Sequence, residues 1–240
     1  MVTRILARSL FAAAVALTGL SSGLSDSNTH LSRREVAIEA TSDAVQVAKA
    51  GSYMRATKLE NGDLLGTYAA VNGTNRTIET VRSSDGAKSW EHVAQVTTGS
   101  ASTSEIDNAF PLQLPDGRLL VAFRNHDKEQ GTSDEFTWFR LTLCESTDGG
   151  KTWQYLSQIA QRDATERNTG LWEPFLRIAD DGSLQAYYSV ENSADDQDNV
   201  MRTSTDGGRT WSEPVQVSGS NITARDGMVG IAETGNGTLM

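Results

Sequence analysis

Polar and aromatic side chains recur at one position in four segments of this sequence. Nine residues before each of four glycines, at 62, 117, 182 and 237, stands a position at which an apolar stretch begins. Those positions and their neighbours are Tyr53, Arg55, Asp107, Asn108, Trp172, Glu173, Asp226 and Met228. A folding core does not require carboxylates, a guanidinium and an amide, so their recurrence favours a binding or catalytic site.

Glu173 is the strongest candidate for chemistry. It stands between Trp172 and Pro174 at the start of the otherwise apolar segment WEPFLRI. A carboxylate in such a place can transfer a proton or act as a nucleophile, and an adjacent indole face suits stacking on a sugar ring. The alternative is that Glu173 is a solvated acid at the end of a strand.

The other candidates are expected to bind substrate. Arg55 would donate hydrogen bonds or lower the pKa of a nearby acid, and the alternative is a surface salt bridge. Asp107, Asn108 and Asp226 could bind hydroxyl groups, although Asp and Asn also favour the ends of loops. Tyr53 completes this set as an aromatic group.

Two further polar residues, Arg124 and His126 in the segment VAFRNH, are weaker candidates, because we expect them at the far end of a second strand. The other histidines, His30 and His92, are distant from His126 and lack the spacing of metal ligands. No phosphate-binding glycine loop precedes a helix. We expect neither a metal nor a cofactor.

An octapeptide written three times indicates the elements that hold these residues. SSDGAKSW (83–90), STDGGKTW (146–153) and STDGGRTW (204–211) each lie between two segments of alternating polarity, which predicts strand, tight turn and strand. The aspartates would accept backbone N–H groups within the turn, and the tryptophans would bury their rings in the core. These structural residues are Asp85, Asp148, Asp206, Trp90, Trp153 and Trp211.

A second hairpin recurs out of phase with the first, in KLENGDLLGTYAA (58–70), LQLPDGRLLVAFR (112–124) and RIADDGSLQAYYS (177–189). A fourth copy begins at IAETGNGTLM (231–240). One unit therefore holds four antiparallel strands in ~60 residues, which is typical of a β-propeller blade. We expect an all-β fold of about three and a half blades, with residues 35–49 as an outer strand.

The fourth blade would stop inside its first hairpin. An unfinished hairpin leaves backbone N–H and C=O groups without partners, and an open ring exposes the face of its last blade. We expect the sequence to be part of a longer protein, and the alternative is that partial blades associate between chains.

The N-terminus has the pattern of a secretory signal peptide. Arg4 and Arg8 precede the apolar run LFAAAVALTGL, which ends at small residues. The run is too short for a membrane-spanning helix, which needs about 20 residues. We predict a signal peptide at 1–23, an N-terminal segment at 24–45 that is processed at Arg33–Arg34, and an incomplete propeller at 46–240, secreted from the cell.

Composition agrees with an extracellular protein. The net charge of −10 becomes −12 without the two arginines of the leader, which disfavours nucleic acid and anionic membranes as partners. The single cysteine, Cys144, excludes an internal disulfide and is expected in the core. Four sequons predict N-glycosylation, at Asn72, Asn75, Asn221 and Asn236.

The repeats resemble a known family. The octapeptides match the Asp-box pattern S-x-D-x-G-x-T-W of sialidase-like six-bladed propellers, although Ala87 and Ser89 depart from it in the first copy. The segments GSYMRATKLENGDLL, IDNAFPLQLPDGRLLVAFRNH and GLWEPFLRIADDGSLQAYYS resemble glycoside hydrolase family 93, the secreted fungal exo-arabinanases. This similarity covers about residue 45 to Met240.

The resemblance implies retaining cleavage of α-1,5-linked L-arabinan, with arabinobiose released from a chain end. Separately, we expect a monomer. Glu173 would be the nucleophile, and the acid/base glutamate would lie just beyond Met240. We therefore expect the 240-residue chain alone to be inactive or poorly soluble.

Two other functions stay open. A sialidase would need further arginines on later blades, and the acidic net charge argues mildly against an anionic substrate. A non-catalytic Asp-box propeller would bind glycans or peptides, because the Asp box specifies the fold rather than the activity.

Overall fold

A computed structural model describes residues 44–131, 135–164 and 170–240, so the predicted signal peptide and most of the N-terminal segment lie outside the described residues. The described residues form three antiparallel sheets, each with four strands in chain order. The first sheet has β1 (Ser52–Lys58), β2 (Leu64–Asn72), β3 (Asn75–Ser83) and β4 (Glu91–Ser100). The second has β5 (Ser104–Gln113), β6 (Leu119–Lys128), β7 (Phe136–Ser146) and β8 (Gln154–Asp163). The third has β9 (Leu171–Ile178), β10 (Leu184–Ser193), β11 (Asp196–Ser204) and β12 (Val215–Ser218).

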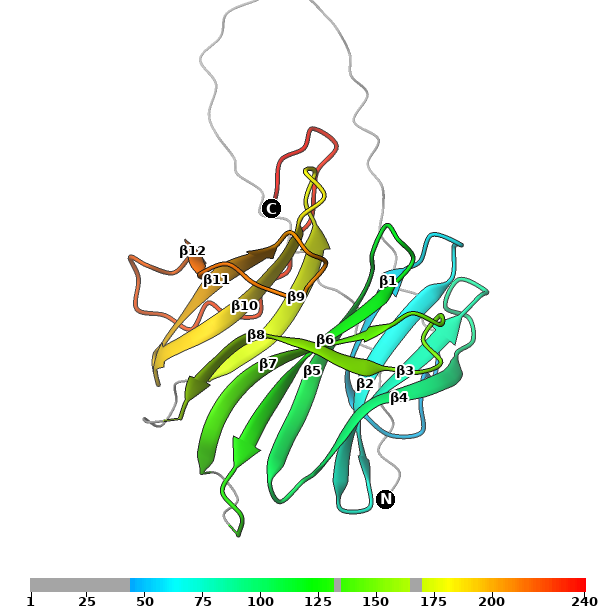
Figure 1. Cartoon of the computed structure of the whole chain (residues 1–240), viewed down its shortest axis with the longest axis horizontal. Helices are drawn as coiled ribbons and strands as arrows, with labels where there is room; N and C mark the ends of the chain where they lie inside the picture. Colours follow the sequence, from blue (N-terminus) through cyan, green and yellow to red (C-terminus); the bar gives the residue numbers. More distant parts are fainter. Residues whose placement is uncertain (1–43, 132–134, 165–169) are drawn as a thin grey trace, which may run out of the picture.

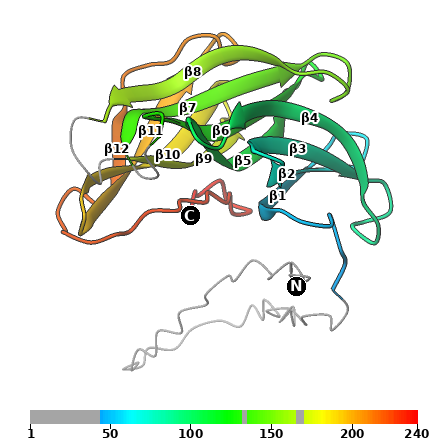
Figure 2. The same ribbon diagram turned by 90° about the horizontal axis from the view of Figure 1, so that it is seen from below.

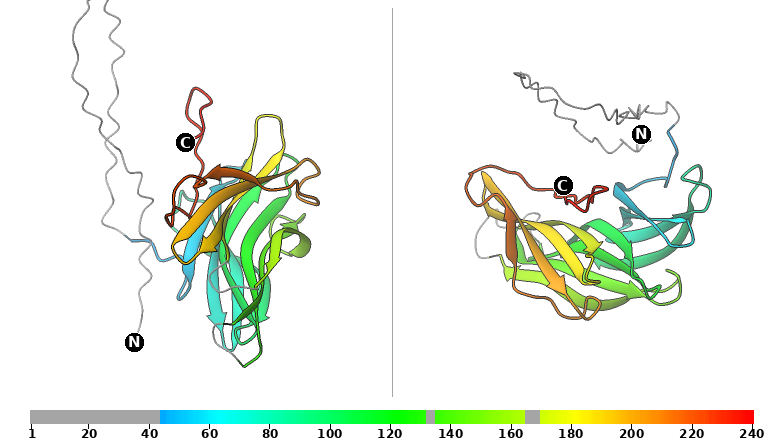
Figure 3. Two further views of the ribbon diagram at one scale, coloured as in Figure 1. Left: turned by 90° about the vertical axis from the view of Figure 1, so that its left-hand side faces the viewer. Right: turned by 90° about the horizontal axis from the view of Figure 1, so that it is seen from above.

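The three sheets stand side by side in an arc (Figure 1). Seen from below, β4, β8 and β12 lie on its outer side, and β1, β5 and β9 lie toward the middle (Figure 2). The C-terminal segment leaves the third sheet and runs along the concave side toward the first sheet (Figure 3). This radial order of four-stranded units confirms the predicted partial propeller.

The four predicted inner hairpins share one turn. In each, the residue three before the marker glycine closes the turn: its carbonyl accepts the N–H of the glycine, and its N–H donates to the carbonyl of the residue after the glycine. This residue is Leu59 in the first copy and Thr234 in the fourth. All four glycines have a positive φ, which an L-residue rarely adopts. The fourth copy adds one bridge between Glu233 and Leu239, so the last described residues begin a fourth unit.

The Asp boxes close the outer hairpins as predicted. Oδ1 of Asp148 accepts the N–H groups of Lys151 at 3.0 Å and Thr152 at 2.9 Å, and Oδ2 accepts the Thr152 hydroxyl at 2.6 Å. Asp85 and Asp206 repeat this pattern. Side-chain and backbone hydrogen bonds from Ser89 lower the pKa of Asp85 to about 2. The tryptophans of the boxes are half-buried rather than fully buried, because they pack where one sheet meets the next.

The second and third Asp boxes are each bound by the preceding sheet. Arg82 donates to the carbonyl of Gly149 at 2.9 Å, and Ser157 donates to the carbonyl of Gly208 at 2.5 Å. The indole N–H of Trp211 donates back to Ser157 at 3.1 Å. The largest apolar cluster fills the space between the second and third sheets. Cys144 is buried in the cluster between the first and second, as expected.

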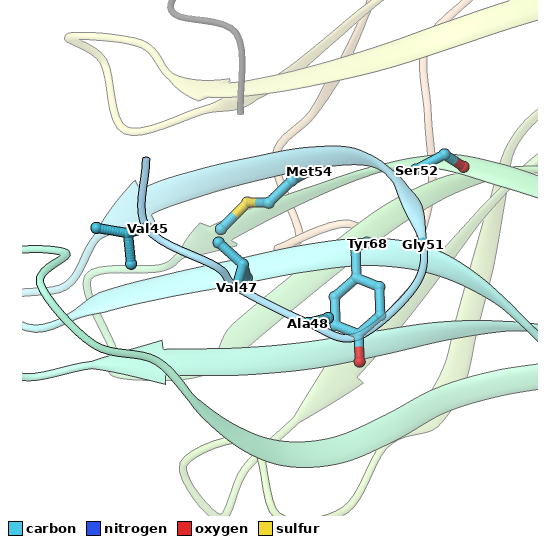
Figure 4. Close-up of a pocket in the computed structure, with 7 residues that line it drawn as sticks. All are labelled: Val45, Val47, Ala48, Gly51, Ser52, Met54 and Tyr68. Atoms are coloured by element: carbon cyan, nitrogen blue, oxygen red, sulfur yellow. The ribbon is translucent and has the colours of Figure 1, made fainter. Parts of the chain in front are cut away.

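The expected outer strand over residues 35–49 is wrong for the part that the structure describes, because residues 44–49 form no strand. Their side chains instead line an apolar pocket on the first sheet, where Val45, Val47 and Ala48 approach Met54 and Tyr68 (Figure 4). The alternating polarity of residues 44–49 therefore indicates that they pack on a sheet, not that they form one of its strands.

The asparagines of all four sequons are exposed. Asn72 and Asn75 face each other across the turn between β2 and β3. Each is accessible to a glycan, and their modification stays a prediction.

Ser157→Ala should destabilise the protein by about 1–3 kcal/mol, because the change leaves the Trp211 N–H and the Gly208 carbonyl without this partner. Urea denaturation of both proteins measures the difference. Ser220→Ala, at an exposed position, is the control and should have no effect. Equal stability of the Ser157 variant would show that the sheets do not depend on this link.

Asp148→Asn should lower the melting temperature at pH 7, because hydrogen bonds from Thr152 and Ser146 hold the pKa of Asp148 well below its usual 3.8. A depressed pKa contributes stability above the unfolded value, and this contribution is lost as the pH falls through the folded value. The deficit should therefore shrink below pH 3.8. Thermal melts across pH, with the exposed Asp195→Asn as control, measure it. A deficit independent of pH would contradict this account.

Candidate functional site

The four positions found by counting back from the glycines share a strained backbone. Tyr53, Asn108, Glu173 and Met228 all have a positive φ, in the left-handed region that L-residues avoid. The pairing register shifts beside the first three of them, so each of these inner strands carries a β-bulge. Bulges change the direction in which side chains point and recur beside functional sites. The sequence spacing located these positions, and the structure shows what they share.

The bulges lie at the end of the sheets opposite the Asp boxes. In the first sheet, Ser52 pairs with Ala69 near the turn at Asn72, whereas β3 runs from that turn to the Asp box at its other end. The same order holds in the other two sheets. The Asp-box aspartates are therefore remote from the candidate site, which agrees with their structural role.

Glu173 is half-buried in the bulge of β9. Burial raises the pKa of its carboxyl above the usual 4.5, and the positive charges of Arg55 and then Arg124 oppose this rise. Arg55, from β1, donates weakly to the carbonyl of Pro174 at 3.5 Å, next to Glu173 in the chain. Desolvation lowers the pKa of Arg55, and the charge of Glu173 is the main effect that opposes it. The two predicted residues thus come together from different sheets.

Asp107 and Asn108 bring the second sheet into the site. Oδ1 of Asp107 accepts the N–H of Asn108 at 2.8 Å, and its Oδ2 lies 3.8 Å from Arg124 and 4.0 Å from Arg76. The side chain of Asn108 is buried, with its residue 1% exposed, and neither polar atom of its amide has a partner among the described residues. A buried amide left unpaired is costly, so it is suited to a hydroxyl group or water.

Trp172 is held on three sides. Its indole N–H donates to Oε2 of Glu191 at 3.1 Å, and the guanidinium of Arg124 lies over its ring, 4.8 Å from the centroid. The ring of His126 meets it edge-on at 5.2 Å. The face that Arg124 covers is not available to a sugar ring, and Gly170 lies close against the indole, where a side chain would not fit.

His126 is a packing residue. It is fully buried, and its Nε2 bonds the carbonyl of Leu171 at 2.9 Å. Burial lowers its pKa to about 3, so the ring is neutral at physiological pH.

Among the described residues, Tyr53, Met228 and Asp226 make no hydrogen bond or ion pair with Glu173, although Tyr53 acts electrostatically on Arg55. Tyr53 is 47% exposed. The backbone of Asp226 accepts a bond from Asn199 at 2.7 Å, whereas its Oδ1 is buried and unpaired within the described part of the chain. The structure therefore unites Glu173, Arg55 and Asp107, and the binding roles of Tyr53 and Asp226 stay predictions.

Arg124 lies toward the far end of β6, as the sequence predicted, and this is the end that carries the site. There it pairs with Asp107 across the β5–β6 ladder and acts on Glu173, so sequence reasoning ranked it too low. Sequence reasoning also missed Glu105, which binds Arg124, and the pair formed by Glu191 and Arg225. The hairpin around Gly117 offered a signal, since strands that diverge from a known turn pair at predictable positions.

No group of His, Cys, Asp and Glu suited to a metal ion occurs in the described ranges. The same ranges contain no helix with the length and hydropathy to cross a membrane.

Comparison with known proteins supports the architecture. Residues 138–239 match a family model described as a BNR repeat-like domain. No curated protein matches the chain significantly. Among solved structures, an α-L-arabinanase of Penicillium chrysogenum in complex with arabinobiose is similar, with 27% identity and a TM-score of 0.60 over 78% of this chain and 55% of that one.

Two further structures agree. A GH93 α-L-arabinofuranosidase of Fusarium graminearum with arabinobiose has 25% identity and a TM-score of 0.60, over 77% of this chain and 53% of that one. An endo-arabinase of Bacteroides thetaiotaomicron shares the fold, with 17% identity and a TM-score of 0.51 over 77% and 66% of the two chains. The chain spans about half the length of the first two. The described residues therefore form a partial β-propeller that includes a BNR repeat-like domain and is similar in structure to the family 93 arabinanases.

Proposed function

We propose that this propeller is a secreted glycoside hydrolase that cleaves α-1,5-linked L-arabinan from a chain end with retention of configuration. The observation that carries the proposal is the position of Glu173. Its carboxyl is half-buried in a strained bulge between Arg55 and Asp107, at the end of the sheets where three inner strands begin. The fold similarity to two proteins bound to arabinobiose supports the substrate class.

In this mechanism the Glu173 carboxylate attacks the anomeric carbon and forms a glycosyl-enzyme intermediate, which water then hydrolyses. Arg55 opposes the effect of burial and favours the ionised carboxylate that the attack requires. The unpaired amide of Asn108 and the indole of Trp172 would bind the sugar.

A second carboxylate must protonate the leaving oxygen, and in retaining enzymes it lies about 5–5.5 Å from the nucleophile. Asp107 does not suit this role, because it accepts the N–H of Asn108 and lies beside Arg76 and Arg124. From the family resemblance we expect the proton donor on the strand that follows Gly237.

A sialidase is the second candidate, because several arginines surround the site. Arg76 and Arg124 are engaged by Asp107 and Glu105, and Arg225 by Glu191. Arg55 has no ion-pair partner among the described residues, so one arginine is free to bind a carboxylate. A neutral sugar therefore fits this part of the site better.

Glu173→Gln should reduce hydrolysis of a dinitrophenyl α-L-arabinobioside by about 10³-fold or more, because the amide cannot act as the nucleophile. This leaving group departs without protonation, so the assay does not depend on the proton donor. Release of dinitrophenol measures the rate. Glu213→Gln, which changes an exposed acid, is the matched control.

Each result of this assay has a meaning. Full activity of the Glu173 variant would contradict the proposed nucleophile. Cleavage of an aryl sialoside in place of the arabinobioside would favour a sialidase. Binding of arabino-oligosaccharides without turnover would favour a non-catalytic propeller.

The raised pKa of Glu173 should also make the stability of the protein depend on pH. A carboxyl whose folded pKa is raised contributes most below its unfolded value, and this contribution is lost as the pH rises through the folded pKa. Ionised Glu173 therefore costs stability at neutral pH, and Glu173→Gln should raise the melting temperature at pH 7. The gain should vanish below about pH 4.5, where both proteins are neutral at this position. Thermal melts at several pH values measure it, and a lower melting temperature at pH 7 would show that the arginines outweigh burial.

A further inference from the structure

An ion network lies behind the indole ring of Trp172. Oε1 of Glu105 lies 2.6 Å from Nη2 of Arg124, and its Oε2 lies 3.0 Å from Nζ of Lys128. The side chains of Arg124 and Lys128 are only 11% and 9% exposed. Because both carboxylate oxygens have a cation, Glu105 holds Arg124 in a fixed place.

Arg124 reaches the candidate site from this anchor. It lies on β6, which contacts β9 of the next sheet. From there its guanidinium covers one face of Trp172 and stands 3.8 Å from Asp107. A planar guanidinium is suited to this double role, since it stacks on aromatic faces and pairs with carboxylates at the same time.

Two other side chains also contact Trp172. Glu191 accepts the indole N–H at 3.1 Å and is itself bound by Arg225 at 2.5 Å, and the ring of His126 stands T-shaped to the indole with centroids 5.2 Å apart. Removal of Arg124 would free one face of a ring that is otherwise fixed. Because Trp172 directly precedes Glu173 in the chain, motion of its ring would also change the position of the Glu173 carboxylate.

We propose that Arg124 is a positioning residue: anchored by Glu105, it fixes the plane of Trp172 and supplies a permanent positive charge beside Glu173. The catalytic part of this inference rests on the proposed function, whereas the electrostatic part does not.

Charged groups face Glu173 from each element packed around it. Arg55 lies on β1, Asp107 on β5, Arg124 on β6 and Arg225 in the segment after β12. Arg55 has the larger effect on Glu173, yet it makes one weak hydrogen bond. Arg124 and Arg225 are held by Glu105 and Glu191, so their positions do not depend on Glu173, and Arg124 has the larger effect of the two.

The test separates charge from shape with two variants of Arg124. Arg124→Met keeps the aliphatic stem and removes the charge, and it should raise the pKa of Glu173 by about 1 unit. Arg124→Lys restores the charge without the stacking plane, and it should return the pKa toward the native value. Carbon-detected NMR titration of labelled glutamate measures both, with Glu173→Gln to assign the signal.

Arg140→Met is the matched control. Arg140 also lies over an indole, that of Trp138, and pairs with Asp127, and both partners are away from Glu173. It should leave the titration unchanged. Thermal melts show whether each variant is folded, and Glu105→Gln, which loosens the anchor, provides a second route to the same shift.

The activity assay adds an independent result. With the dinitrophenyl arabinobioside, Arg124→Met should move the acidic limb of the rate profile upward with the pKa, and Arg124→Lys should keep that limb while kcat/KM falls by about 10-fold. An unchanged titration in folded Arg124→Met would overturn the proposal even if the enzyme is active. A shifted titration in a protein without hydrolysis would support the electrostatic role and refute the proposed function instead.

Discussion

The candidate site depends on a backbone conformation that is unfavourable in isolation. Each of the inner strands β1, β5 and β9 holds one non-glycine residue in the left-handed region, at its β-bulge. This conformation costs roughly 1–2 kcal/mol per residue, because Cβ comes too close to the following carbonyl oxygen. Such a cost is tolerated only where the surroundings fix the chain. Here β2, β6 and β10 pair with the inner strand on both sides of the bulge, so the ladder holds the strained residue in place. The repeat thus places one side chain per sheet at the same end of the molecule.

The Asp boxes, which stabilise the fold, lie at the end of the sheets opposite the bulges. Their carboxylates satisfy backbone N–H groups within the turn, and the turn is then bound by the preceding sheet through Arg82 or Ser157. These bonds stabilise the order of the sheets without reference to any ligand. The end that carries the bulges can therefore hold unpaired and partly desolvated groups, such as the Asn108 amide, without loss of the fold.

Much of this was predictable from spacing, because turns constrain sequence strongly. The glycines need positive φ and the Asp-box aspartates need short, fixed contacts, so both leave a signal that repeats. Position relative to Gly117 also located Asn108, and asparagine adopts the left-handed region more readily than most residues. Residues 44–49 were misread, because alternating polarity is the same for a strand and for a segment that packs on one.

Arg124 shows why pairing across a bulge escapes sequence analysis. Leu112 pairs with Leu120, and a regular ladder from that pair would set Arg124 opposite Asn108. The bulge adds one residue to β5, so Arg124 pairs with Asp107 instead. A one-residue slip moves side chains to the opposite face of a strand. The same type of β-bulge therefore has two effects. In the third sheet it orients Glu173, and in the second sheet it brings Arg124 opposite Asp107.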